Sequence, residues 1–265
     1  MADPLSPADA LALLEWQIEL GADEAIGDAP VNRYEDPAAP PENLPEPAPV
    51  AEPPPAPHVM RAPDGDVAVA EARRLAAGAP DLATLRQAME AYPHCELRHA
   101  ARNFVFSDGR PGARVMILGE APGRDEDLQG KPFVGRAGQL LDKMFAAIGM
   151  GRAQDGDNAL YIANILPWRP PQNRDPTPAE MAMMLPFVKR HVELAAPEVL
   201  VPMGNISCQG ILGRRGITRL RGQWTEALGK PVLPMFHPAY LLRNPIMKRE
   251  AWGDLQELRT RLRDG

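Results

Sequence analysis

The sequence predicts an α/β protein, folded as a three-layer α/β/α sandwich around a central, parallel-rich sheet of four strands. Two observations carry this prediction. Beyond residue 64, short apolar segments alternate with longer amphipathic ones, which is the pattern of βα units. The apolar segments are also nearly continuous, as expected for strands that are covered by helices on both faces. At 265 residues, the chain is long enough for one sizeable core and a smaller appendage.

The first 64 residues differ in composition from the rest of the chain. Residues 1–26 predict a helix, with Ser6 as its N-cap and Pro7 in its first turn. Residues 27–64 contain 12 prolines and predict a disordered, acidic linker. These 64 residues carry 13 acidic and 2 basic side chains, so residues 65–265 carry a net charge of +5. A mildly basic body is compatible with nucleic acid as a partner.

The remaining elements follow in order from periodicity and capping signals. Gly78 and Pro80 separate two predicted helices, and Asp81 is a suitable N-cap for the second. The predicted helices are Asp66–Ala77, Asp81–Ala91, Ala137–Ile148, Thr177–Ala195, Asn205–Leu212 and Lys248–Leu262. The predicted strands are Arg114–Leu118, Leu160–Asn164, Val199–Met203 and Val232–Phe236, with a short β segment at Asn103–Phe106. Residues 65–265 are therefore expected to form one domain.

Several classes of protein are excluded or disfavoured by composition. The only cysteines are Cys95 and Cys208, which form no disulfide framework and fit a reducing, cytoplasmic environment. No apolar run approaches the roughly 18 residues of a membrane span, and the N-terminus lacks the basic region of a secretory signal. We find no GxGxxG, GxxxxGK[ST], HxExxH or GxSxG pattern. Metal sites and common nucleotide folds are thus unsupported.

One loop is longer than an ordinary connection between a strand and a helix. The stretch Gly119–Leu141 reads GEAPGRDEDLQGKPFVGRAGQLL and lies between an apolar run and an amphipathic one. Most such connections span about two to six residues. Its glycines allow the backbone to approach a ligand closely. In an open α/β sheet this position is the carboxyl end of a strand, where ligands bind.

Chemically useful side chains follow all four predicted strands. Glu120, Glu126 and Phe133 follow the first strand, and Asn164 ends the second. Gly204 and Asn205 follow the third strand, and His237 follows the fourth. A carboxamide and an imidazole can bind the polar edge of a planar heterocycle while an aromatic ring stacks on its face. Each residue also has an ordinary structural explanation, as a turn, core or solvated side chain. Their placement at separate strand ends favours a common site.

Three motifs in this order resemble those of the uracil-DNA glycosylase superfamily. They read GEAPGRDED…GKPFVGRAGQLL, YIANILPWRPPQNRDPTPAE and FHPAYLLRNP. The match is greatest with family 4, the bacterial and archaeal iron–sulfur type, and covers about Leu82–Leu262. The resemblance implies an enzyme that flips deoxyuridine out of DNA and hydrolyses its N-glycosidic bond. It would release free uracil and leave an abasic site for base-excision repair.

The resemblance also implies a role for each site residue. Phe133 would stack on uracil, Asn164 would pair with its polar edge, and His237 would donate a hydrogen bond to a uracil oxygen. Glu120 would position or activate water, and Glu126 lies in the same motif as a further catalytic candidate. The implied uracil-pocket wall is Ala121, Pro122 and Gly123. The implied DNA contacts are Arg136, Asn173, Arg174, Leu241, Leu242 and Arg243, of which the two leucines and Arg243 would form the minor-groove wedge.

The chain departs from family 4 at the iron–sulfur cluster. The four cysteine positions of the family correspond here to Tyr92, Cys95, Trp168 and Met184. A single remaining cysteine cannot hold such a cluster, so we predict no cluster and no other cofactor. The three replacing side chains could instead fill the vacated volume. A serine that is frequent in the third motif is replaced by Ala239.

Two alternative functions remain open at this stage. The loss of the cluster and the acidic N-terminal arm are compatible with a catalytically weak protein that binds DNA or a partner. A glycosylase for another deaminated base is the second alternative. The expected partners are uracil-containing DNA and, through the N-terminal helix, a replication or repair protein. We expect a monomer that is cytoplasmic and associated with the nucleoid, without a membrane contact.

Overall fold

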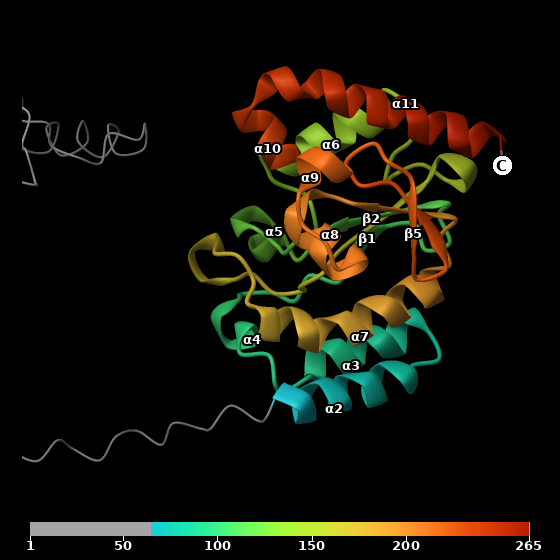
Figure 1. The fold of residues 1–265 in the computed structure, drawn as a ribbon. Helices are drawn as coiled ribbons and strands as arrows, with labels where there is room; N and C mark the ends of the chain where they lie inside the picture. The colour runs from blue at the N-terminus through green and yellow to red at the C-terminus, as the bar shows by residue number, and fades with distance from the viewer. Residues whose placement is uncertain (1–64, 265) are drawn as a thin grey trace, which may run out of the picture. The chain divides into compact units, whose positions relative to one another are not determined.

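A computed structural model describes residues 65–264 of the chain, and it confirms the predicted α/β class. The predicted N-terminal helix and proline-rich linker lie outside these residues. In Figure 1, a central sheet lies between one layer that contains α6 and α11 and another that contains α7, with α3 and α2 stacked beyond it. No helix in the described range combines the length and the hydropathy that crossing a membrane requires.

The helices form largely where their capping residues predict. Asp81 accepts a hydrogen bond from the Thr84 amide at 2.7 Å and begins α3, Leu82–Ala91. Thr177 and Glu180 form a reciprocal capping box at the start of α7, Pro178–Ala195. The other helices are α2 (Gly65–Ala77), α4 (Leu97–Ala100), α5 (Arg124–Gln129), α6 (Arg136–Ala146), α8 (Gly204–Leu212), α9 (Ile217–Leu220), α10 (Pro238–Arg243) and α11 (Lys248–Asp264). Single 3₁₀ turns are η1 (Gly156–Asn158), η2 (Pro171–Asn173) and η3 (Pro245–Met247).

The sheet contains four parallel strands at its centre and one antiparallel strand at each edge. Its order is β1-β3-β2-β4-β6-β5. The central strands are β3 (Leu160–Asn164), β2 (Val115–Gly119), β4 (Val199–Pro202) and β6 (Lys230–Val232). The edge strands are β1 (Ser107–Gly109) and β5 (Thr225–Ala227). Gly119 and Asn164 are register partners, so the ends of β2 and β3 lie side by side.

The structure corrects the prediction at the two edges. The β segment expected at Asn103–Phe106 occurs instead at β1, four residues later in the chain. The strand expected at Val232–Phe236 is split into β6 and an isolated bridge between Met203 and Met235. Leu233 and Met235 still donate to the carbonyls of Leu200 and Pro202, but Pro202 of β4 has no N–H group to donate back, which explains the break. The edge strands β1 and β5 contain no apolar alternation and were therefore not distinguishable as strands of this sheet.

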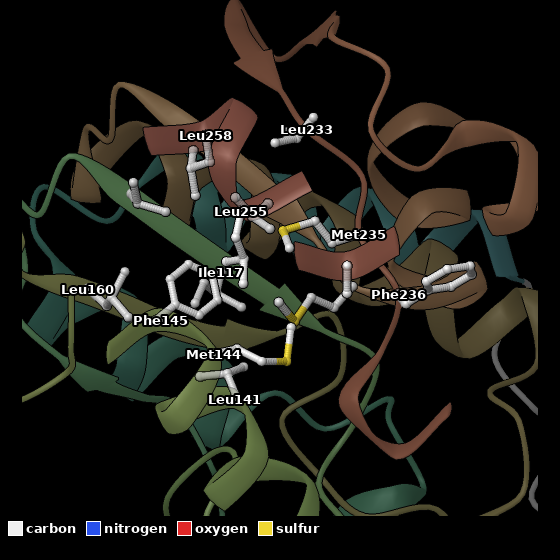
Figure 2. Packing of buried hydrophobic residues seen from close by; sticks show 14 of the residues in the cluster. Ile117, Leu141, Met144, Phe145, Leu160, Leu233, Met235, Phe236, Leu255 and Leu258 are labelled. Atoms are coloured by element: carbon white, nitrogen blue, oxygen red, sulfur yellow. The ribbon is translucent and has the colours of Figure 1, made fainter. Parts of the chain in front are cut away.

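The two faces of the sheet are buried in separate hydrophobic clusters. Ile117 of β2 packs on one face with Phe145 of α6 and Leu255 of α11, and all three are almost fully buried. Figure 2 shows these side chains meeting between the strand and the two helices. On the other face, Met116 and Leu118 pack in a cluster that includes Val188 of α7. Alternate residues of one apolar strand thus face opposite helical layers, as the continuous apolar pattern predicts.

Candidate functional site

A pocket of about 520 Å³ opens at the carboxyl edge of the parallel strands. Residues that follow all four central strands line it, so the predicted convergence of these strand ends is observed. Every residue of the implied catalytic and uracil-binding set lies in this lining: Glu120, Ala121, Pro122, Gly123, Glu126, Phe133, Asn164 and His237. This edge is where ligands bind in open α/β sheets.

Asn164 presents an unpartnered amide group at the pocket. Its side chain is 6% exposed, and its Nδ2 has no hydrogen-bond partner within the described residues. An unpaired buried donor costs about 1–3 kcal/mol, so this amide is ready to bind a ligand acceptor. Gly119 makes room for it, because a Cβ at Gly119 would overlap the Asn164 Oδ1 and lie 2.6 Å from the Phe133 ring. The register of β2 and β3 therefore determines the position of Asn164.

Phe133 is held in a strained backbone conformation beside Asn164. Its φ of 53° lies in the left-handed region, which costs a residue other than glycine about 1–3 kcal/mol. Its side chain is 5% exposed, and its ring centroid lies 5.4 Å from that of His237. The two rings are tilted by 30° relative to each other. Phe133 and His237 thus form adjoining surfaces of one pocket.

His237 caps α10 and is arranged as a neutral hydrogen-bond donor. Its Nδ1 accepts a hydrogen bond from the Ala239 amide at 3.2 Å. Burial, assisted by the charge of Arg243, lowers the pKa of His237 to about 4. The ring is therefore neutral at pH 7, and with Nδ1 acting as the acceptor its proton lies on Nε2. Nε2 is then available to donate to a ligand.

Glu120 is the carboxylate of the pocket whose pKa is most suited to proton transfer. Burial, together with the negative charge of Asp175, raises the pKa of Glu120 to about 7, while the charge of Arg215 opposes this rise. A base with a pKa close to the working pH is well suited to general base catalysis. Asp175 also lines the pocket. Asp175 lies within the second motif, but its residue type alone predicted no role for it.

Glu126 lines the pocket and is bonded there to backbone amides. Its Oε2 accepts from the Gly123 amide at 3.1 Å, and its Oε1 accepts from the Val134 and Gly135 amides at 3.0 Å each. The side chain therefore joins the start of α5 to the segment after Phe133. These three bonds occupy the carboxylate with backbone amides, and the catalytic role expected for Glu126 stays a prediction. Glu126 is the third residue of α5, where an acidic side chain commonly accepts from the N-cap amide.

The residues expected to contact DNA divide into two groups. Arg136 and Arg243 are exposed, and Asn173 lines the pocket while accepting a hydrogen bond from Arg169. Arg174 instead forms a bidentate ion pair with Glu180, at 2.9 and 2.6 Å, and joins the pocket loop to α7.

The two leucines expected in the minor-groove wedge differ in burial. Leu241 is fully buried in the cluster beneath α10 and cannot enter DNA without leaving the core. Leu242 is half-buried. The exposed apolar side chain of this region is Ile246 in η3, which is 82% exposed. It lies three residues after Arg243, which lines the pocket. Ile246 is not among the DNA contacts that the resemblance implies, because the third motif ends at Pro245.

The four positions that correspond to cluster cysteines lie together in one apolar cluster. Tyr92, Cys95, Trp168 and Met184 are each at most 3% exposed. The Tyr92 hydroxyl donates to the Ala68 carbonyl at 2.6 Å. Burial raises the pKa of the Cys95 thiol to about 11, which disfavours the thiolate that binds metal. These residues do not fit an iron–sulfur cluster, and residues 65–264 contain no group of three or more His, Cys, Asp or Glu that could hold a metal ion.

Replacing Trp168 by alanine is expected to lower the free energy of unfolding by about 3–5 kcal/mol, because it leaves a cavity in this cluster. Trp168 packs 5.4 Å from Phe104 between ring centroids. Urea denaturation of the two proteins measures the change. Trp252→Ala is the control, because that side chain is 41% exposed and should change stability little. A chelator should leave both transitions unchanged. A loss below about 1 kcal/mol for Trp168→Ala would show that this corner is not held by packing.

The fold and the pocket together define a class of protein. The sequence model of the uracil DNA glycosylase superfamily matches residues 106–256, which include every strand end that lines the pocket. The chain belongs to the uracil DNA glycosylase superfamily.

Within this superfamily the chain is similar to type-4 enzymes. A type-4 uracil-DNA glycosylase of Archaeoglobus fulgidus is 39% identical over 173 residues, which are 62% of this chain and 84% of the relative. The type-4 uracil-DNA glycosylase of Thermotoga maritima is 40% identical over 153 residues, covering 57% and 77% of the two chains. A DNA polymerase of Bacillus phage SP01 is 32% identical over 137 residues, which are 52% of this chain and 14% of the polymerase. The predicted family is confirmed.

Proposed function

We propose that this protein is a monofunctional uracil-DNA glycosylase that releases uracil from DNA and leaves an abasic site. The observation that carries the proposal is the unpartnered Asn164 amide, which is buried beside an aromatic ring and a neutral imidazole. A carboxamide can pair with the donor and acceptor edge of uracil, whereas the corresponding edge of cytosine has a different arrangement of hydrogens. The similarity to type-4 uracil-DNA glycosylases supports the same assignment.

The proposed reaction separates charge, and the pocket is arranged to stabilise both products of that separation. When the bond between C1′ and N1 breaks, its electron pair leaves with uracil, and the sugar becomes a cation. The Nε2–H of His237 stabilises the developing negative charge on a uracil oxygen without transferring its proton. Phe133 stacks on the base. Glu120 stands beside the cationic sugar and accepts a proton from the water that adds to C1′.

The experiment is single-turnover incubation of the full chain with oligonucleotides that differ in one base. Free uracil is expected from the uracil oligonucleotide, while matched thymine and cytosine oligonucleotides are expected to remain intact. Hypoxanthine and xanthine oligonucleotides complete the set. Faster release of either purine than of uracil would assign the pocket to that other deaminated base.

The activity should rise with pH up to about 7 and then become constant. Glu120 acts as a base only when deprotonated, and burial raises its pKa to about 7. The carboxylate is therefore protonated and inactive below that pH. His237 has a pKa of about 4 and contributes nothing to the profile between pH 5 and 9. The kcat/KM measured over this range should follow one ionisation, and Glu120→Gln should remove it. A Glu120→Gln enzyme with the wild-type profile would exclude this role.

We further propose that Ile246 inserts into duplex DNA in place of the buried Leu241. Exposed basic residues lie beside it: Arg243, Lys248 and Arg249. None of the three forms an ion pair within residues 65–264. An apolar side chain flanked by free cations is suited to enter a base step while the cations bind phosphates. With Arg136, these residues make up the proposed DNA surface, and Arg243 among them lines the pocket.

Ile246→Ala should reduce uracil release from duplex DNA by about 10-fold and leave release from single-stranded DNA nearly unchanged. The wedge offsets the few kcal/mol of unstacking that only the duplex requires. Rates on the two substrates measure the effect. Val67→Ala is the matched control, because Val67 is 56% exposed on α2. An equal loss on both substrates would exclude a wedge.

The remaining assignments are proposals of the same kind. We propose that the protein works without an iron–sulfur cluster, supported by the packed side chains at three of the four cluster positions. An absorption spectrum of the purified protein should lack a band at about 400 nm.

We also propose that the protein acts as a monomer on DNA in the cytoplasm. Residues 1–26 are proposed to bind a replication or repair protein, and deletion of residues 1–64 should leave uracil release intact.

A further inference from the structure

Arg152 lies outside every motif that defines the pocket, yet it is bonded to the backbone on which Phe133 stands. Its Nη1 donates to the Pro132 carbonyl at 2.9 Å, and its Nη2 donates to the Phe133 carbonyl at 2.8 Å. The side chain is 17% exposed. One guanidinium group therefore binds the two carbonyls on either side of the Phe133 α-carbon.

Two carboxylates fix the guanidinium group in turn. Asp142 of α6 accepts from its Nε at 2.9 Å, and Asp108 of β1 accepts from its Nη1 at 3.0 Å. The planar arrangement of donors is specific to arginine, because a lysine ammonium cannot bind this set in one plane. The pocket loop is thus connected to the sheet edge and to α6 through a single side chain.

The other surroundings of Phe133 complete the restraint. Glu126 accepts from the amides of Val134 and Gly135, so Arg152 binds the carbonyls and Glu126 the amides of consecutive peptide groups. A Cβ at Gly138 would overlap the Phe133 carbonyl, so α6 also abuts this peptide. A backbone in the left-handed region persists only where its surroundings hold it, and here they do so from three directions.

From this geometry we propose that Arg152 is a positioning residue, which keeps Phe133 in its left-handed conformation and its ring in the stacking position. This inference rests on the proposed function of the pocket. Without Arg152 the carbonyls of Pro132 and Phe133 lose their shared donor, and Phe133 relaxes toward ordinary backbone angles. The ring then leaves the plane in which it meets the base. Arg152 touches no substrate and acts only through Phe133.

A double-mutant cycle with Phe133 tests this role. Arg152→Ala is expected to lower kcat/KM for uracil release by about 10²-fold, the cost typical of a displacement of about 1 Å. Phe133→Ala should cost at least as much. In the double variant the two losses should not multiply, because Arg152 has no other route to the substrate. The loss should be equal on single-stranded and duplex DNA, in contrast to the loss at Ile246.

Three further variants keep the test decisive. Arg190→Ala is the matched control. Arg190 of α7 also binds a backbone carbonyl, that of Ala79, and a carboxylate, that of Glu193. It should retain wild-type kcat/KM. Arg152→Lys should remain folded and recover little of the loss, whereas Asp142→Asn should show a smaller one. Thermal unfolding of every variant separates folding from function.

Multiplicative losses in the cycle, or full activity of Arg152→Lys, would overturn the positioning role. A wild-type protein that releases no uracil would instead overturn the proposed function. The two failures are therefore distinguishable.

Discussion

Replacing Asn164 by alanine is expected to reduce uracil release by about 10²- to 10³-fold without lowering the stability of the protein. The Asn164 Nδ2 has no partner within the described residues, so its removal breaks no internal hydrogen bond of that atom. In the complex the same amide would pair with uracil, and its loss leaves a uracil acceptor buried and unpaired. Single-turnover rates and thermal unfolding of the two proteins measure the two quantities.

Asn164→Asp tests the hydrogen-bonding pattern of this side chain separately from its shape. This variant has nearly the same volume but lacks the N–H donor when ionised. It should lose uracil release to a similar degree. Asn158→Ala, at an exposed position in η1, is the control and should retain the wild-type rate of uracil release. If Asn164→Ala released uracil at the wild-type rate, the pocket would not recognise uracil through this amide.

His237→Ala should also lower the rate of uracil release by about 10²- to 10³-fold, the typical cost of removing one donor to a developing anion. The hydrogen bond from Ala239 to Nδ1 leaves Nε2–H as the donor. The low pKa of His237 means that the ring donates while neutral, so its contribution should not change between pH 5 and 9. The rate of bond cleavage is the quantity to measure, because the interaction strengthens in the transition state.

His237→Gln distinguishes a donor from a proton-transfer group. A glutamine amide donates a hydrogen bond but transfers no proton, so it should recover part of the lost rate. His99→Ala, on the exposed surface of α4, should behave as wild type. A His237→Gln rate no higher than that of His237→Ala would indicate that the wild-type histidine transfers a proton.

The central strands and the position of the pocket were predictable because strands buried on both faces are continuous apolar runs in the sequence. Val115–Gly119 is an apolar run followed by Glu120, and Leu160–Asn164 is an apolar run that ends at Asn164. Parallel strands place such ends at one edge of the sheet. Edge strand β5 was not predictable, since its three residues show no apolar pattern and join β6 through positive-φ residues at Leu228 and Gly229.

The support of the pocket could not be predicted in the same way. Arg152 binds backbone carbonyls 19 and 20 residues earlier in the chain, and a carbonyl bears no residue-specific signal. The burial of Leu241 was hidden for a different reason. A leucine beside a functional histidine looks the same in sequence whether it faces DNA or the core, and only the packing under α10 decides. The occupation of Glu126 by three amides is likewise a tertiary property.

The most direct test of the central claim is detection of free uracil. The full-length protein, in stoichiometric excess, is incubated with a single-stranded oligonucleotide that contains one deoxyuridine, and both products are identified by mass spectrometry. The account predicts free uracil and an oligonucleotide with an intact abasic site, with a rate that falls at least about 10²-fold in Asn164→Ala and in His237→Ala. An intact oligonucleotide after prolonged incubation with folded wild-type protein would contradict it, as would equal release by all three proteins.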